Sequence, residues 1–216
     1  MAGAARAQGE PLRWFEELYA EADAGRASVP WADLAPNPHL VSWRTLDQLQ
    51  PGRALVVGCG YGDDAEWLSA RGWDVTAFDI SPTAVGACRR RFPETRVEYV
   101  PADLTSPPQE WRSFDLVVEI YTVQVLPPGS AERAAAIAAL RDLTARDLLV
   151  VARGRAATEA EGGMPWPLTE AEVHSFAGDG LDERAFEDFH DDEDPPVRRF
   201  RAHFQRAATL ASGRVR

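Results

Sequence analysis

The chain has 216 residues, of which 34 are acidic and 23 are basic, so its formal net charge at pH 7 is −11. This acidic balance, without a basic stripe, argues against a nucleic-acid partner. No apolar run approaches the roughly 20 residues of a membrane span, and the first residues lack the apolar segment of a secretory signal. Only two cysteines occur, Cys59 and Cys88, in no metal or redox spacing. We therefore expect a cytoplasmic protein with free thiols, no metal and no membrane partner.

The N-terminal part is predicted to form a helical unit outside the main domain. Aromatic residues and leucines at helical spacing predict a helix over Leu12–Ala22. Pro38 begins a second predicted helix that runs to Leu49. The expected units are a disordered tail (1–10), a helical cap over the active site (11–50), a core domain (51–206) and a second tail (207–216).

Strands and helices are predicted to alternate through the core domain. The run Phe114–Glu119 is mostly apolar, as expected for a strand whose two faces are both covered. This alternation predicts a parallel sheet with helices on both faces. The predicted strands cover 53–57, 73–78, 97–100, 114–119 and 147–152, and the predicted helices cover 63–71, 82–92 and 130–143.

The last third of the chain follows a different pattern. A sequence that resembles a capping box, Thr169–Glu172, opens a predicted helix over Leu168–Phe176. Glu183–Phe189 and Arg198–Arg206 alternate apolar and polar residues, which is typical of strands with one solvated face. Consecutive acids cannot all face one ion, so the acidic run 191–194 favours a solvated connection over a metal site. The predicted fold is α/β, a single Rossmann-like, seven-stranded, mostly parallel sheet with helices on both faces and a C-terminal antiparallel hairpin.

The stretch from the first predicted strand to Asp79 carries the clearest functional signal. Three alternating glycines, Gly58, Gly60 and Gly62, follow the strand and precede a helix. Glycine lets the backbone turn sharply and lets a ligand approach the free N–H groups at a helix start. Asp79 ends the next strand, 19 residues after Gly60, where an acid can accept hydrogen bonds from ribose hydroxyls. The pattern predicts a nucleoside-cofactor site.

The spacing of the glycines favours S-adenosylmethionine over a dinucleotide. The dinucleotide fingerprint is G-x-G-x-x-G, whereas this chain has aspartate at position 63. Asp63 and Asp64 suit the helix macrodipole but would repel a pyrophosphate at the same place. A cationic sulfonium cofactor without phosphate tolerates them. A nicotinamide-dependent oxidoreductase or epimerase, and a non-catalytic cofactor-binding protein, remain as alternatives of other classes.

With these residues in order, the chain resembles the class I S-adenosylmethionine-dependent methyltransferases. More narrowly, it resembles their thiopurine and thiol branch, which includes halide and tellurite-resistance relatives. The resemblance covers about residues 12–206. It rests on the glycine loop, on Trp14, Pro30-Trp31 and Pro38 near the N-terminus, on Glu119-Ile120-Tyr121-Thr122 with Leu126-Pro127-Pro128, and on the sequence from Gly162 to Thr169.

The resemblance implies roles for individual residues. The glycine loop, with Cys59 in it, would lie under the methionine part of the cofactor. Asp79 would bind the ribose, and the adenine would lie against Ile80, Asp103 and Leu104. The methionine end would be lined by Glu119 and Ile120, and Trp31 would face the reacting methyl group.

We expect a small-molecule methyltransferase whose acceptor is a thiol or a related soft nucleophile, in a monomer or a homodimer. Aromatic faces stabilise a sulfonium, which makes Trp31 and Tyr121 the candidate catalytic residues. The predicted substrate-binding residues are Trp14, Tyr121, Gln124, Met164 and Trp166. A thiol needs no strong base, whereas a hydroxyl does. Oxygen and nitrogen acceptors stay open, and His39, the histidine of the cap, is expected to pack rather than to act as a base.

Overall fold

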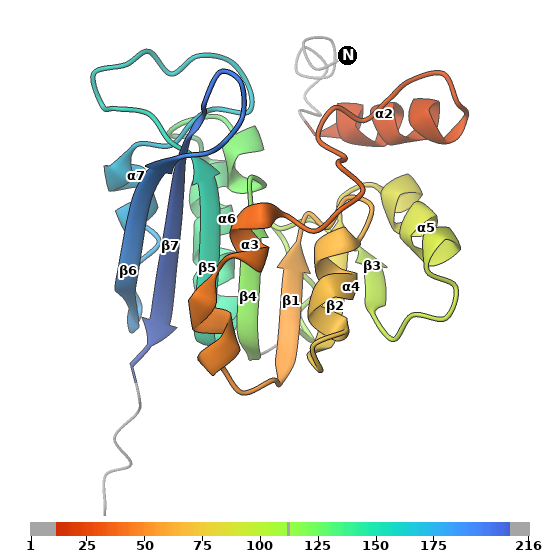
Figure 1. Cartoon of the computed structure of the whole chain (residues 1–216), viewed down its shortest axis with the longest axis horizontal. Coiled ribbons are helices and arrows are strands. Elements are labelled where there is room, and N and C mark those ends of the chain that lie inside the picture. Colours follow the sequence, from red (N-terminus) through yellow and green to blue (C-terminus); the bar gives the residue numbers. More distant parts are fainter. Residues whose placement is uncertain (1–11, 112, 208–216) are drawn as a thin grey trace, which may run out of the picture.

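The computed structural model describes residues 12–111 and 113–207, and it forms one seven-stranded sheet with the strand order β3-β2-β1-β4-β5-β7-β6 (Figure 1). Strands β1 to β5 run parallel, and the final pair forms the predicted antiparallel hairpin at one edge. The predicted fold class is therefore confirmed. The strands are β1 (Arg53–Val57), β2 (Asp74–Asp79), β3 (Glu98–Pro101), β4 (Phe114–Ile120), β5 (Thr144–Arg153), β6 (Leu181–His190) and β7 (Arg198–Arg206).

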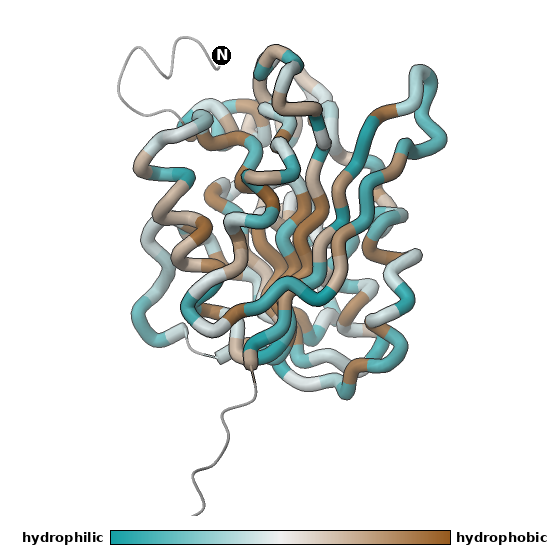
Figure 2. The backbone as a smooth tube through the Cα atoms, turned by 90° about the vertical axis from the view of Figure 1, so that its left-hand side faces the viewer, coloured by the Kyte–Doolittle hydropathy of each residue, from teal (hydrophilic) through white to brown (hydrophobic). Residues whose placement is uncertain are grey.

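The helices lie on both faces of this sheet and at its upper edge. One hydrophobic cluster joins one face of the sheet to α6 and α7, and a second joins the other face to α3, α4 and α5. Figure 2 shows hydrophobic residues concentrated along the central strands. The helices are α2 (Arg13–Asp23), α3 (Pro38–Val41), α4 (Asp63–Ser69), α5 (Pro82–Arg91), α6 (Ala131–Leu143) and α7 (Glu170–His174), with short 3-10 helices η1 (Arg44–Gln48) and η2 (Val123–Val125).

Some predicted boundaries differ from the structure. The helix predicted over Pro38–Leu49 begins at Pro38 as expected, but it is not continuous, because Trp43 takes an extended backbone between α3 and η1. This break buries the Trp43 indole, which is 4% exposed and packs edge-on against His203. Strand β5 begins at Thr144, earlier than predicted, because Thr144 directly caps α6. The capping box before α7 is confirmed at Thr169 and Glu172.

The chain before β1 lies outside the sheet, and α2 lies above the carboxyl ends of the parallel strands, close to α5 (Figure 1). The predicted tails, 1–10 and 207–216, fall outside the described residues except for Ala207. Among the described residues, no helix has the length and apolar character needed to cross a membrane. The position of α2 places it at the edge where ligands bind in open α/β sheets.

A buried polar cluster joins β5 to β7. Asp147 on β5 is fully buried, and one of its carboxylate oxygens lies 2.8 Å from Nε2 of His203 on β7. Arg146 and Gln205 donate further hydrogen bonds to the same carboxylate. Burial alone would raise the pKa of Asp147, but these hydrogen bonds outweigh it and lower the pKa. The folded protein therefore stabilises the ionised carboxylate.

We predict that Asp147→Ala lowers the free energy of unfolding by about 3–5 kcal/mol at pH 7, because it leaves buried partners unpaired. The lowered pKa means that the stabilisation is present at neutral pH and is lost only as the pH falls below the ordinary value of 3.8. Urea denaturation at pH 7 and at low pH measures both effects. The control Asp188→Ala breaks the more exposed ion pair with Arg198 and should cost at most about 1 kcal/mol. Equal losses in the two variants would contradict the prediction.

Candidate functional site

The glycine loop between β1 and α4 has a backbone that only glycine accommodates well. Gly58, Gly60 and Gly62 have φ values of 60°, 53° and 89°. A Cβ atom on Gly58 would lie 2.3 Å from Oγ1 of Thr122, and one on Gly62 would lie 2.4 Å from the Tyr99 hydroxyl. The loop is therefore a close-fitting backbone cradle at the carboxyl end of β1.

Asp79 ties this loop to the end of β2. The Gly60 N–H donates to one carboxylate oxygen of Asp79 at 3.0 Å, and the Ser81 N–H donates to the other at 2.9 Å. Burial raises the pKa of Asp79 to about 6, against the effect of these backbone hydrogen bonds. Each oxygen keeps a further lone pair, so the carboxylate is suited to accept from a pair of sugar hydroxyls beside the loop.

The end of β3 brings the predicted adenine-binding residues to the same edge. The Ala102 N–H donates to the backbone oxygen of Asp79 at 3.0 Å, which places Asp103 beside the end of β2. One carboxylate oxygen of Asp103 accepts from the N–H and the hydroxyl of Thr105, both at 2.8 Å. Leu104 is 6% exposed, and Ile80 is half-buried. Their roles toward a cofactor stay predictions.

At the end of β4, Glu119 has a structural task. Its side chain is 1% exposed and accepts from the Val123 N–H at 2.8 Å, while burial raises the pKa of Glu119 to about 7. Thr122 donates its hydroxyl to the backbone oxygen of Val57 at 3.1 Å. Glu119 and Ile120 therefore lie next to the glycine loop, and the Glu119 carboxylate supports the turn that follows β4.

The two acids that open α4 are both engaged. Asp63 forms a two-bond ion pair with Arg91, at 2.9 Å for each bond. Asp64 accepts from the Asn37 N–H at 2.6 Å, and burial raises the pKa of Asp64 to about 6. Carboxylates thus surround the start of α4, the place where a dinucleotide-binding protein holds its pyrophosphate.

The predicted methyl-facing residue, Trp31, packs on α2. Its indole N–H donates to the Tyr19 hydroxyl at 3.0 Å, and its ring meets Trp14 edge-on at 5.8 Å. Trp31 remains 44% exposed, whereas Trp14 is 8% exposed. The structure brings these two predicted residues together above the sheet edge, and it leaves their roles as predictions.

Two residues of α2 that sequence reasoning missed reach the cofactor edge. The Glu16 carboxylate accepts from the hydroxyls of Ser81 and Thr83, both at 2.5 Å. Tyr19 is 2% exposed and lies against Gly60. The available signal was the spacing of three between Glu16 and Tyr19, which puts both on one face of the helix.

Tyr121, predicted as catalytic and substrate-binding, follows β4 with an unusual backbone. Its φ of 61° lies in the left-handed region, which is uncommon for a large side chain and marks a constrained position. The guanidinium of Arg199 lies 5.1 Å from the centre of its ring. Burial is the main cause that raises the pKa of Tyr121, so the phenol stays protonated at neutral pH.

The predicted solvated connection at 191–194 is wrong for its first residue. Asp191 accepts from the Val197 N–H at 2.8 Å and pairs with Arg199, which is 6% exposed. Asp191 therefore orders the connection between β6 and β7 and neutralises the arginine beside Tyr121. Among the described residues, no group of three or more histidine, cysteine, aspartate or glutamate side chains is placed to hold a metal ion.

Gln124 joins three segments through its side chain. Its amide oxygen accepts from the Arg153 N–H at 2.7 Å, and its amide nitrogen donates to the backbone oxygens of Arg153 and Trp166 at 3.1 and 2.8 Å. The Trp166 N–H in turn donates to the Gln124 backbone oxygen. Gln124 thus joins η2 by hydrogen bonds to the end of β5 and to the loop that carries Met164 and Trp166; we call this set of bonds the clamp. Its predicted contact with substrate remains untested.

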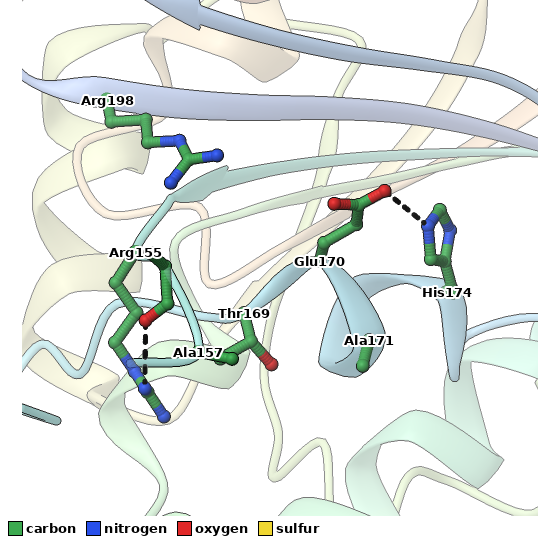
Figure 3. Close-up of a pocket in the computed structure, with 8 residues that line it drawn as sticks. Arg155, Ala157, Thr169, Glu170, Ala171, His174 and Arg198 are labelled. Carbon is green, nitrogen blue, oxygen red and sulfur yellow. Dashed lines mark hydrogen bonds and ion pairs between the residues drawn. The ribbon is translucent and has the colours of Figure 1, made fainter. Parts of the chain in front are cut away.

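A hollow of about 410 Å³ lies elsewhere, between α7 and the start of β7 (Figure 3). Its charged groups are already paired: His174 with Glu170 and Glu183, and Arg198 with Asp188. None of its lining residues belongs to the glycine loop or to the ends of β2 and β3. We place the candidate site at the carboxyl ends of β1 and β2 around Gly60 and Asp79, because open α/β sheets bind ligands in a crevice at this edge.

Comparison with known proteins finds a family match over part of the chain. Residues 54–146 match a family described as a methyltransferase domain. This stretch is therefore similar to a methyltransferase domain. A probable thiopurine S-methyltransferase of Yarrowia lipolytica is 32% identical over 71 residues. The matched stretch spans only 32% of each of the two chains, about a third of that curated relative.

Solved structures share the fold of the methyltransferase domain and of most of the chain. One has a TM-score of 0.71 at 18% identity, and the match covers 91% of this chain and 93% of the solved chain. It is described as concerning conversion of a disulfide bond into a thioacetal group during echinomycin biosynthesis. Another is 1,6-didemethyltoxoflavin-N1-methyltransferase of Burkholderia thailandensis, with a TM-score of 0.68 at 16% identity. The match covers 88% of this chain and 86% of the solved chain. The chain therefore shares its fold with a methyltransferase of known structure.

We predict that Gln124→Leu lowers the free energy of unfolding by about 2–4 kcal/mol, because it removes the partners of buried backbone groups beside the methyltransferase domain. Urea denaturation followed by circular dichroism measures the loss. As a control, Gln48→Leu at an exposed position of η1 should change stability by less than about 0.5 kcal/mol. A Gln124→Leu variant as stable as the control would show that the clamp contributes little.

Proposed function

We propose that the protein is an S-adenosylmethionine-dependent methyltransferase that acts on a small molecule, with a thiol or a related soft nucleophile as the acceptor. The hydrogen bond from the Gly60 N–H to Asp79 carries this proposal. It presents a glycine backbone and a buried carboxylate side by side at the carboxyl edge of the sheet. A nucleoside with an amino-acid end and no phosphate matches both surfaces.

In this proposal the chain mainly binds and aligns the reactants. Asp79 holds the ribose, Asp103 and its neighbours hold the adenine, and the glycine loop lies under the amino-acid end. When bound, the cofactor would supply a methyl group on a sulfonium, whose sulfur leaves readily as a neutral thioether. The remaining tasks of the protein are to hold the acceptor in line and to exclude water. The segment that carries α2 and Trp31 covers this edge and suits the second task.

The acids at the start of α4 support a sulfonium cofactor over a dinucleotide. Asp63 and Asp64 stand where a pyrophosphate would need N–H donors and a positive helix end. Asp64 is also committed to the Asn37 N–H. A nicotinamide dinucleotide would therefore meet two carboxylates, whereas a phosphate-free cofactor does not require that position.

Three observations support a thiol acceptor. The curated relative is a probable thiopurine S-methyltransferase, and a structural neighbour concerns sulfur chemistry in echinomycin biosynthesis. His174 and His203 are paired with carboxylates, and His39 packs against Phe189. Burial, followed by the nearby Arg199, lowers the pKa of His39. A thiol, which ionises near neutral pH, needs no base from these residues.

We predict that S-adenosylhomocysteine binds and that its affinity falls as the pH drops through about 6. A ligand that donates to the ionised Asp79 lowers the raised pKa of that group, so protonation opposes binding. The dissociation constant should rise by up to about tenfold per pH unit below that value. Asp79→Ala should remove this dependence and weaken binding about 10- to 100-fold at pH 7.5, measured by calorimetry.

Binding of NADH or NADPH, with no binding of S-adenosylhomocysteine, would overturn the cofactor assignment. Unchanged affinity in Asp79→Ala would overturn the ribose assignment alone.

We further predict that thiols give the highest turnover in a panel of thiols, phenols, amines and halides with S-adenosylmethionine as the donor. Release of S-adenosylhomocysteine measures the rate for each acceptor, and mass spectrometry identifies the methylated product. The rate with thiols should rise with pH as the thiolate fraction grows. Turnover confined to phenols or amines would show that the acceptor is oxygen or nitrogen, as in an N-methyltransferase. Cofactor binding without turnover on any acceptor would favour a non-catalytic protein.

A further inference from the structure

Tyr19 brings a phenol from outside the sheet to the centre of the candidate crevice. It lies on α2, and its ring packs with Val29 and Ala84 in a small hydrophobic cluster, edge-on to Tyr61 at 5.4 Å. A Cβ atom on Gly60 would lie 3.3 Å from its hydroxyl oxygen. The hydroxyl therefore touches the loop at the residue that donates to Asp79.

The Tyr19 hydroxyl has an unused proton. Its oxygen accepts from the Trp31 indole N–H at 3.0 Å. Within 12–111 and 113–207, no recorded hydrogen bond has this hydroxyl as its donor. Burial, and next the negative charge of Asp79, raise the pKa of Tyr19 far above its ordinary value, so the proton stays on the oxygen at physiological pH. A buried hydroxyl with a proton to donate therefore lies close to Gly60, the loop residue that Asp79 holds.

We infer that Tyr19 is a cofactor-binding residue whose hydroxyl donates a hydrogen bond to a ribose oxygen of the nucleoside. The inference rests on the proposed function. Asp79 accepts from ribose hydroxyls, and Tyr19 donates to an oxygen of the same sugar, so together they match both kinds of polar group that a ribose offers. Helix α2 thereby becomes a wall of the cofactor crevice as well as a cover over it.

The anchors of α2 hold Tyr19 in this position. Glu16, one turn before Tyr19, accepts from the Ser81 and Thr83 hydroxyls and from the Thr83 N–H at 3.2 Å. Near the other end of α2, Asp23 pairs with Arg90. Ser81 is also the residue whose N–H holds Asp79. A ribose bound between Tyr19 and Asp79 would therefore bridge two segments that share one support, and it should steady α2.

Tyr19→Phe tests the inference, because it deletes the hydroxyl and keeps the ring in its cluster. Calorimetry with S-adenosylhomocysteine and with 5′-methylthioadenosine, which keeps the ribose but lacks the amino-acid end, measures the effect. We expect both dissociation constants to rise about three- to tenfold, as for loss of one neutral hydrogen bond. The control Thr144→Val removes a buried hydroxyl at the start of β5, at the other end of the sheet, and should leave both affinities unchanged. Thermal unfolding checks that the variants remain folded.

The outcomes separate this inference from the proposed function. If the wild-type protein binds neither ligand, the proposed function fails, and the inference fails with it. If the wild-type protein binds both and Tyr19→Phe binds them equally well, the inference alone fails. A loss confined to S-adenosylhomocysteine would place the hydroxyl at the amino-acid end and overturn the ribose contact.

Hydrogen exchange of the wild-type protein gives a second measurement that needs no variant. Saturating S-adenosylhomocysteine should slow exchange of the α2 amides, Arg13–Asp23, by at least threefold, because the bound ribose ties α2 to the end of β2. The exposed strand β6, Leu181–His190, serves as an internal reference that should not change. Equal exchange of α2 with and without a ligand that calorimetry shows to be bound would overturn the inference.

Discussion

The crevice depends on one hydrogen bond, from the Gly60 N–H to the carboxylate of Asp79. This bond fixes the glycine loop after β1 against the end of β2, and it does so with a group whose burial raises its pKa to about 6. A buried carboxylate that resists ionisation is costly for folding. Its presence at the edge where open α/β sheets bind ligands is typical of a residue retained for recognition.

The start of α5 extends this constraint to the segment before the sheet. The Ser81 N–H holds Asp79, while the Ser81 hydroxyl, together with Thr83, holds Glu16 of α2. Helix α2 and the Asp79 carboxylate are thus both hydrogen-bonded to the short turn at the start of α5. Because these groups share neighbours, changes in the position of α2 and of Asp79 should be coupled rather than independent.

The opposite part of the edge is built from connections rather than from the sheet. Gln124 clamps the turn after β4 to the end of β5 and to Trp166, and Asp191 fixes Arg199 beside Tyr121. Connections vary more readily than strands, and substrate specificity commonly resides in them. The family match over residues 54–146 includes Gln124 but ends before Trp166 and Arg199, so the later connections lie outside it.

The sequence by itself determined the parts of the molecule that depend on neighbours along the chain. Apolar runs and alternation predicted all seven strands, and the capping box before α7 was correct, because local patterns decide these elements. The glycine loop and Asp79 were visible for the same reason, since a strand, a turn and a helix start fix their positions. Where packing outweighs local preference the prediction was wrong, as at Trp43, whose burial divides a predicted helix.

Only the tertiary structure decided which distant groups meet. Glu16 reaches Ser81 across 65 positions, and Gln124 reaches Arg153 across 29. The local sequence can place Glu16 and Tyr19 on one face of a helix, but it does not show which residues that face meets. The sequence likewise predicted that Asp191 is one solvated acid in an acidic run. In the folded hairpin, Arg199 lies beside it and pairs with it. Such contacts arise from chain topology, because side-chain periodicity records which face is buried and not which partner covers it.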